Sequence, residues 1–184
     1  MLMLRYLTAL LVLLFALPAS ATDAGWAALR EGGHVVLLRH AMISGSAEPA
    51  NFDIGQCNTQ RNLSDRGRQQ ARKIGALFGA RAARIERVQS SRYCRCLDTA
   101  RLAFGSQPEA LDALDPLSED AEERSRQIDA ILEEIRTYSG SDLLVLVTHL
   151  ENIQEITGVS PREGEVVIVA PQGDGVRVLG RVTF

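Results

Sequence analysis

The sequence predicts an α/β fold, a three-layer sandwich in which helices flank a mostly parallel central sheet. Two short segments are almost entirely apolar, 34–38 and the run "LLVLVT" that ends at Thr148. Such runs are typical of strands that are covered on both faces. Around them lie segments whose apolar residues recur at helical spacing, and strands that alternate with helices indicate a layered α/β sheet.

The N-terminal half of the chain supplies the first elements in order. The stretch "WAALREGG" predicts a short helix from Trp26 to Arg30, ended by two glycines, and the strand 34–38 follows it. Residues 41–62 show no period and are rich in Gly, Ser, Pro and Asn. A loop of this length in a compact domain is usually functional. Ser64 is the expected N-cap of a helix over about 65–82.

The C-terminal half continues the alternation. A short strand ends at Ser90 and a helix follows over "YCRCLDTARLAF". A weak strand is expected at 110–114, and a strongly periodic helix over 121–138. After the strand that ends at Thr148, a short helix stops at Gly158. The segments "EVVIVA" and "GVRVLGRVTF" predict a closing pair of strands around the turn "PQGDG".

The first twenty-one residues form a segment of their own. A single basic residue, Arg5, precedes an apolar run over 6–17, and a proline and small residues follow. This order is typical of a secretory signal peptide, here cleaved after Ala21. The run is shorter than the roughly 20 apolar residues of a spanning helix. We therefore expect a periplasmic or secreted protein with one domain over 22–184, and no stable membrane insertion after cleavage.

The overall charge argues against a general polyanion partner. The chain has 20 basic and 23 acidic residues and a formal net charge of −3 at pH 7, so we expect no nucleic acid partner. Arginines nevertheless gather between Arg61 and Arg101, whereas lysine occurs once, at Lys73. Because a guanidinium group can bind a phosphate or carboxylate through two parallel hydrogen bonds, a small anionic group is a plausible ligand.

Three cysteines follow the export signal and should meet an oxidising compartment. Cys94 and Cys96 are too close in sequence to pair easily with each other. We therefore expect Cys57 to form a disulfide with one of them, and the sequence leaves open which one. A metal site is the weaker alternative, because the trio lacks the ligand spacing of known metal sites.

Polar side chains follow three of the predicted strands. Arg39 and His40 come after the first strand, residues 90–95 after the second, and Thr148 and His149 after the fourth. In open α/β sheets, ligands bind beyond the carboxyl ends of the strands. Two histidines and two arginines are thus expected to meet at one edge of the sheet.

Four motifs along the chain resemble the histidine phosphatase superfamily. "LLRHA" is similar to its Arg-His signature, and "LSDRGRQQA" to its helix-opening pattern Leu-Ser/Thr-x-x-Gly-x-x-Gln-Ala. "SSRYCRCLDTA" resembles its two serines with an arginine four residues after the second, and "VLVTHLENI" its second histidine. They occur in the family's order between His34 and about Gly158. The resemblance implies a phosphoglycerate-mutase-like fold.

The resemblance also implies roles for four residues. His40 would be the nucleophile and form a transient phosphohistidine that water hydrolyses. Arg39 and Arg95 would bind the nonbridging phosphate oxygens, and His149 would donate a further hydrogen bond. Because these residues supply the positive charge, no metal and no cofactor are expected.

A phosphatase also needs an acid that protonates the departing alkoxide. By resemblance to the phosphoglycerate-mutase-like branch, Glu119 in "DPLSED" is the expected acid, and Glu151 just after the second histidine is the alternative. Both could equally be surface carboxylates near helix N-termini. Arg61 and Asn62 are candidate substrate-binding residues, with a purely structural place in the loop weighed equally.

These observations favour an exported, metal-independent phosphomonoesterase. Its expected substrate is a phosphorylated small molecule, a cell-envelope sugar or a protein. The alternative is a non-catalytic module that binds a phosphorylated group, and a competent acid would distinguish the two. A thiol-disulfide device at Cys94 and Cys96 is a third interpretation, but the sequence shows no redox fold around them.

Overall fold

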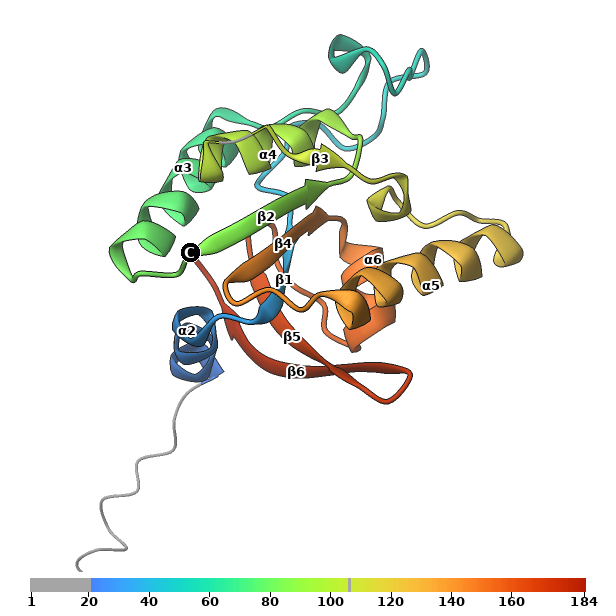
Figure 1. Ribbon diagram of the computed structural model, residues 1–184. Coiled ribbons are helices and arrows are strands. Elements are labelled where there is room, and N and C mark those ends of the chain that lie inside the picture. Colours follow the sequence, from blue (N-terminus) through green and yellow to red (C-terminus); the bar gives the residue numbers. More distant parts are fainter. Residues whose placement is uncertain (1–20, 106) are drawn as a thin grey trace, which may run out of the picture.

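The computed structural model describes residues 21–105 and 107–184 (Figure 1). Its centre is a six-stranded sheet with the strand order β3-β2-β4-β1-β5-β6. Strands β1 (His34–Arg39), β2 (Ile85–Ser90), β3 (Glu109–Ala110) and β4 (Leu143–Thr148) run parallel to one another. Strands β5 (Val166–Gln172) and β6 (Gly175–Val182) are antiparallel and extend the sheet beyond β1.

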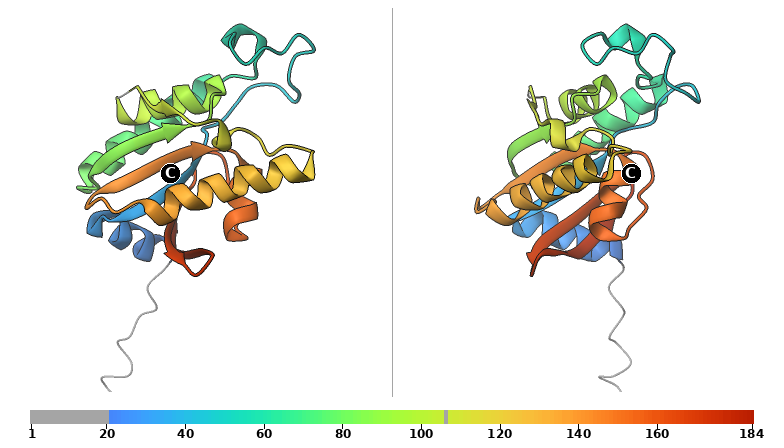
Figure 2. Two further views of the ribbon diagram at one scale, coloured as in Figure 1. Left: turned by 45° about the vertical axis from the view of Figure 1, so that its right-hand side comes forward. Right: turned by 90° about the vertical axis from the view of Figure 1, so that its right-hand side faces the viewer.

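The sheet separates two hydrophobic layers, as its strand pattern dictates. Successive side chains of a strand point to opposite faces. Val36 and Leu38 therefore pack with helices α2 (Ala21–Glu31), α3 (Asp65–Ala80) and α4 (Cys94–Phe104). Val35 and Leu37 pack on the other face with α5 (Ala121–Thr137) and α6 (Leu150–Thr157). The views in Figure 2 show the helices on both sides of the sheet, so the predicted three-layer α/β sandwich is confirmed.

The expected strand at 110–114 is the main error in the predicted elements. Strand β3 has only two residues, and a 3₁₀ turn over Asp112–Leu114 follows it. Ala113 and Leu114 are buried there because they contribute to the layer under α5. A short apolar run can satisfy its burial in either conformation, and periodicity alone does not distinguish them.

Most helices begin and end close to the expected positions, but α2 begins at Ala21, five residues before the expected start at Trp26. Ser64 caps α3, its side chain accepting a hydrogen bond from the amide of Gly67. Helices α4 and α6 end at Gly105 and Gly158, whose φ angles of 68° and 71° lie in the left-handed region that glycine adopts without strain. Helix α3 ends at Ala80, two residues earlier than expected.

The two ends of the described chain pack against each other. Trp26 of α2 is 5% exposed and forms edge-on contacts with Phe78 of α3 and with Phe184. The guanidinium of Arg81 lies 4.2 Å from the centre of the Trp26 ring. Phe184 and α2 thereby contribute to the same hydrophobic layer.

The predicted signal peptide falls almost entirely on residues 1–20, which lie outside the described residues. In the part of the chain that the structure describes, none of the helices is long and apolar enough to span a membrane.

Candidate active site

Three parallel strands end side by side at one edge of the sheet. Arg39 at the end of β1 is paired in register with Thr148 at the end of β4. The amide of His40 donates to the carbonyl of Thr148 over 3.0 Å, and the amide of Ser91 donates to the carbonyl of Val147 over 2.9 Å. The residues directly after β1, β2 and β4 are thereby held at neighbouring positions.

His40 is buried and held in one tautomer. Its side chain is 4% exposed, and Nδ1 lies 2.9 Å from the carbonyl oxygen of Ala41. Because a carbonyl only accepts, Nδ1 carries the proton and Nε2 keeps its lone pair. Burial, followed by the charges of Arg95 and Arg39, lowers the pKa of His40 to about 3, although the hydrogen bond to Ala41 acts in the opposite direction. The imidazole of His40 is therefore neutral at ordinary pH, and its Nε2 lone pair is free.

His149 lies beside His40, with ring centres 5.5 Å apart. A guanidinium nitrogen of Arg95 lies 3.4 Å from its Nδ1, and Ser91 Oγ lies 2.9 Å from its Nε2. Since arginine can only donate, Nδ1 accepts and Nε2 carries the proton. Burial, followed by the charge of Arg95, holds the pKa of His149 well below its usual value of 6.5. In this state the ring is neutral.

Three arginines surround His40 with incompletely paired guanidinium groups. The Nε atoms of Arg39, Arg61 and Arg95 are all buried and lack a hydrogen-bond partner among the described residues. All three charges act on the pKa of His40. Buried donors in native proteins are almost always paired, so three unpaired cationic donors around one histidine indicate a site for an oxyanion.

Glu48 from the 41–62 loop occupies part of this site. Its carboxylate forms an ion pair with Arg95 at 2.6 Å and accepts a hydrogen bond from the amide of Arg61 over 2.8 Å. The side chain of Arg95 is 8% exposed and that of Glu48 31%. Glu48 was not predicted as a site residue, because nothing in the sequence near residue 48 indicates a partner 47 positions further along the chain.

Asp115 is a second carboxylate linked to the histidines. It is buried, accepts a hydrogen bond from Ser91 Oγ over 2.8 Å and pairs with Arg92. The hydrogen bond that Arg92 donates to Asp115 raises the pKa of Arg92. Ser91 in turn contacts His149, so a continuous chain of hydrogen bonds runs from Asp115 through Ser91 to His149 and Arg95.

The two predicted acids are not hydrogen-bonded to the histidines. Glu119 is exposed and lies just before α5, and Glu151 lies in the first turn of α6. Neither makes a hydrogen bond or ion pair among the described residues, although the charge of Glu151 acts on the pKa of Cys96. Glu119 therefore stays a prediction that the static geometry does not favour.

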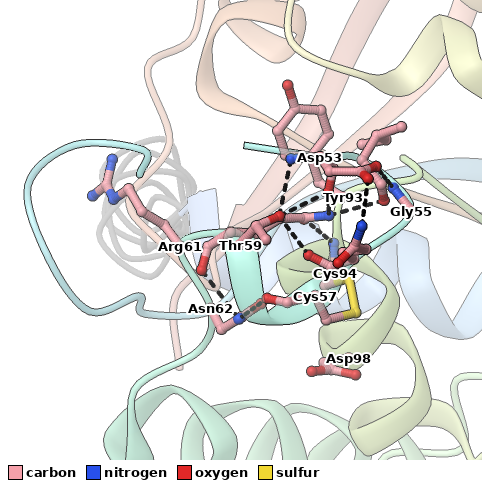
Figure 3. Close-up of a disulfide and its surroundings, with 12 residues drawn as sticks. Asp53, Gly55, Cys57, Thr59, Arg61, Asn62, Tyr93, Cys94 and Asp98 are labelled. Carbon is pink, nitrogen blue, oxygen red and sulfur yellow. Dashed lines mark hydrogen bonds between the residues drawn. A yellow bond between two sulfur atoms is a disulfide. The ribbon is translucent and has the colours of Figure 1, made fainter. Parts of the chain in front are cut away.

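The two predicted substrate-binding residues lie in the 41–62 loop. Arg61 donates through one terminal nitrogen to the carbonyl of Gly45, over 2.7 Å. Asn62 donates from its side-chain amide to the carbonyls of Cys57 and Gln60. Arg61 thus combines a loop contact with a charge near His40, whereas the contacts of Asn62 shape the loop itself (Figure 3).

A disulfide fastens this loop to the start of α4. Cys57 and Cys94 are bonded, with Cα atoms 5.6 Å apart, as Figure 3 shows. The amide of Cys94 also donates to the side chain of Gln60 over 2.9 Å. A disulfide from Cys57 was expected, and its partner is Cys94. Cys96 is a buried free thiol, and burial raises its pKa to about 12. It is a poor nucleophile, which weakens the thiol-disulfide interpretation.

The remaining family motifs have a structural explanation. Gly67 in the first turn of α3 lies so close to the backbone of Met42 that a side chain would overlap its carbonyl oxygen. Gln70 accepts from the amide of Met42 over 3.0 Å and donates to the carbonyl of Glu163 over 2.8 Å. Thr99 accepts from the amide of Ala41 over 3.0 Å. These contacts fix the backbone that follows His40 from two helices.

The described residues include no cluster of three or more His, Cys, Asp or Glu side chains that could hold a metal ion.

Comparison with protein families places this geometry in a known context. The model of the histidine phosphatase superfamily, branch 1, matches residues 35–123. This segment contains Arg39, His40 and Arg95. Sequence match and fold agree, so the resemblance to the histidine phosphatase superfamily is confirmed. No curated protein matches the sequence.

Solved structures share the fold at low sequence identity. One is a structure described as the phosphohistidine phosphatase SixA of Agrobacterium tumefaciens. It superposes with a TM-score of 0.60 at 20% sequence identity, and the match covers 83% of this chain and 98% of that chain. The protein histidine phosphatase SixA complexed with tungstate gives 0.58 at 19% identity, covering 82% and 96%. The phosphoserine phosphatase from Entamoeba histolytica in complex with 3-phosphoglyceric acid gives 0.58 at 12% identity, covering 82% and 97%. At these identities the similarity shows the fold alone.

Proposed function

We propose that this protein is an exported, metal-independent phosphomonoesterase that forms a transient phosphohistidine on His40. One observation carries the proposal: a neutral buried imidazole with a free Nε2 lies near three arginines whose buried Nε–H groups find no hydrogen-bond partner among the described residues. The family match and the phosphatase names of its structural neighbours support phosphatase chemistry.

The first chemical step needs the phosphate charge to be neutralised. Arg39 and Arg95 bind the nonbridging oxygens, and the phosphate displaces the Glu48 carboxylate from Arg95. His40 Nε2 attacks phosphorus, the N–P bond forms, and the bond to the alkoxide breaks. The resulting phosphoimidazolium keeps its Nδ1 proton, which the carbonyl of Ala41 stabilises. Water then attacks phosphorus, and the N–P bond breaks to restore His40.

His149 changes its protonation state when the substrate binds. It is neutral in the free protein because burial and Arg95 oppose its charge. A phosphate dianion near Nδ1 favours the protonated ring. His149 then donates a hydrogen bond to a phosphate oxygen and adds a charge that opposes the negative charge of the transition state.

For the acid that protonates the leaving alkoxide we retain Glu119, with Glu151 as the alternative. Single variants Glu119→Gln and Glu151→Gln test them, and Asp115→Asn belongs in the same series because its carboxylate is already linked to His149 through Ser91. Loss of the acid should slow the hydrolysis of alkyl phosphates far more than the hydrolysis of aryl phosphates, because an aryl oxide can leave without being protonated.

A second candidate function is a module that binds a phosphorylated group without turnover. Two observations favour it: the Glu48 carboxylate pairs with Arg95, and among the described residues neither Glu119 nor Glu151 is hydrogen-bonded to a histidine. Such a module would bind phosphate and hydrolyse esters at a negligible rate.

Export rests on the predicted signal peptide and is supported by the Cys57–Cys94 disulfide, since disulfides persist in oxidising compartments. Expression of the full-length chain in a bacterium should give a periplasmic or secreted product that begins at Thr22. N-terminal sequencing checks this, and a cytoplasmic product that keeps residues 1–21 would contradict it.

Hydrolysis of an aryl phosphate in the presence of a chelator tests the proposed function. We expect turnover by the protein over 22–184, together with a phosphoryl adduct that is labile to acid and detectable by intact-mass measurement after rapid quenching. His40→Asn should abolish both. His34→Asn is the matched control, because His34 lies at the opposite end of β1. Phosphate binding without turnover would favour the binding module, and turnover retained by His40→Asn would refute the mechanism.

A further inference from the structure

A cleft beside the histidines has no place in the mechanism described so far. It has a volume of about 470 Å³, within the range of small-molecule sites. We call it the Tyr93 cleft, and its walls include Phe52, Ile54, Tyr93, Asp112, Asp115 and Gln127. The 41–62 loop, the segment after β2, the 3₁₀ turn after β3 with the residues that follow it, and helix α5 together form it.

The Tyr93 cleft adjoins the proposed phosphate site through one side chain. The ring of Tyr93 lies 5.2 Å from that of His149, and the guanidinium carbon of Arg95 lies 4.4 Å from the centre of the Tyr93 ring. A phosphate bound at Arg95 and a group bound in the cleft are therefore close enough to belong to one ester. The cleft is placed to hold the leaving group.

One wall of the cleft presents an aromatic surface. Phe52 stacks on Tyr93, with ring centres 5.3 Å apart and planes 26° from parallel. Phe52 is 38% exposed, and it is the one large hydrophobic side chain so exposed in the described part of the chain. Thr59, which accepts from the amide of Asp53, and the nearby disulfide hold this part of the loop in place. An apolar ring held at the mouth of a cleft indicates a ligand that packs against it.

The charges in the cleft argue against a second anionic group. Arg92 is paired with Asp115, and Arg126 with Glu123 at 2.6 Å. Asp112 remains as an additional carboxylate that makes no hydrogen bond through its side chain among the described residues. The cleft wall thus carries two cationic side chains, those of Arg92 and Arg126, and three carboxylates, those of Asp112, Asp115 and Glu123. A neutral group with many hydroxyl donors therefore fits this wall better than a polyphosphate or an acidic peptide.

We infer that the Tyr93 cleft binds the sugar moiety of a sugar phosphate whose phosphate lies at His40. An aromatic ring with carboxylates around it matches a pyranose, whose C–H bonds pack on the ring while its hydroxyls donate to carboxylate oxygens. This inference rests on the proposed function, because it assigns the leaving group of that reaction. A sugar in a glycan and a free sugar phosphate share this chemistry.

Specificity constants for matched primary alkyl phosphates test the inference. Glucose 6-phosphate should exceed ethyl phosphate in kcat/KM by about tenfold or more, a ratio typical of a few pocket contacts. Phe52→Ala and Asp112→Asn should each bring the ratio close to one, chiefly through KM. Asp129→Asn, which removes an exposed carboxylate on the same helix away from the cleft, should leave the ratio unchanged.

Three comparisons keep the outcome decisive. Methyl glucoside 6-phosphate, whose anomeric carbon is substituted as in a glycan, should match glucose 6-phosphate if the sugar lies within a glycan, and should fall behind it if the sugar is free. A phosphoserine peptide that is hydrolysed faster than either sugar phosphate would overturn the inference, as would a ratio near one in the unmodified protein. In the His40→Asn protein, calorimetric binding of glucose 6-phosphate against inorganic phosphate tests the cleft without turnover. Tighter sugar phosphate binding there would support the cleft even if the proposed hydrolysis fails.

Discussion

The ion pair between Glu48 and Arg95 gives the sharpest prediction about phosphate affinity. A phosphate that binds Arg95 must displace a carboxylate lying 2.6 Å from the guanidinium. The substitution Glu48→Gln removes that charge but keeps the shape and one acceptor oxygen. We expect the variant to bind inorganic phosphate more tightly than the unmodified protein, because phosphate no longer competes with an internal anion.

The magnitude follows from the burial of the two partners. A hydrogen bond to a charged group contributes about 1.5–3 kcal/mol. The side chain of Arg95 is 8% exposed and that of Glu48 31%, so solvent screens the pair in part and the lower end of that range applies. In Glu48→Gln, the free energy of phosphate binding should therefore be more favourable by about 1.4 kcal/mol, which corresponds to a tenfold lower Kd.

Isothermal titration calorimetry with inorganic phosphate measures this change directly. Glu155→Gln is the matched control, because Glu155 forms an ion pair with Arg124 on the surface and away from the site. Its Kd should equal that of the unmodified protein. An unchanged or weaker affinity in Glu48→Gln would refute the reasoning, and would mean that Glu48 orients Arg95 for phosphate rather than competing with it.

Three further predictions concern pH and the disulfide. Sulfate, which stays a dianion between pH 5 and 8, should bind more tightly as the pH falls, because the anion brings a proton to His149, whose pKa is low in the free protein. Calorimetry in buffers of different ionisation enthalpy counts that proton, and no uptake would contradict the role of His149. The free energy of unfolding should decrease as the pH is lowered from 6.5 to 3. The reason is that His40 takes up a proton below its ordinary pKa of 6.5 in the unfolded chain, but only near pH 3 in the folded protein. Urea unfolding of His40→Asn should show a shallower decline, and equal slopes would count against a neutral buried His40. Replacing Cys57 and Cys94 together by serine should lower the free energy of unfolding by at most about 4 kcal/mol for a 37-residue separation, and equal urea midpoints for the two proteins would rule out this contribution.

The alternation of strands and helices made the centre of the site predictable. Arg39 ends an apolar strand, and His40 and His149 each directly follow one. Parallel strands present their carboxyl ends at the same edge of the sheet. The positions of these three side chains therefore follow from the apolar segments that form β1 and β4. Arg95 was predictable for a related reason, since it lies in the first turn of the helix that follows β2.

The loop contacts could not be predicted in the same way. The ion pair of Glu48 with Arg95 depends on the path of an aperiodic segment, and no local pattern determines that path. The choice between Cys94 and Cys96 depends on the phase of α4, because residues two apart on a helix point to nearly opposite sides. Cys94 begins the helix and points to the loop, whereas Cys96 points to the carbonyl of Thr148.

The prediction of Glu119 as the acid shows a further limit. Glu119 was chosen because it follows the expected third strand. In the structure, β3 has only two residues, and a 3₁₀ turn lies between this strand and Glu119. The turn buries Asp115 next to Ser91 and leaves Glu119 in solvent four positions later. A sequence pattern does not reveal which of several neighbouring carboxylates a short turn directs inward.

The contact between the two chain ends offers a practical advantage for every measurement above. Trp26 is the single tryptophan of the chain, and from α2 it packs against Phe78 of α3 and against Phe184. Its fluorescence therefore reports whether α2 is packed against Phe184. Trp26 does not line the Tyr93 cleft, so its fluorescence, excited at the red edge of the absorption spectrum, can follow unfolding while a ligand occupies that cleft.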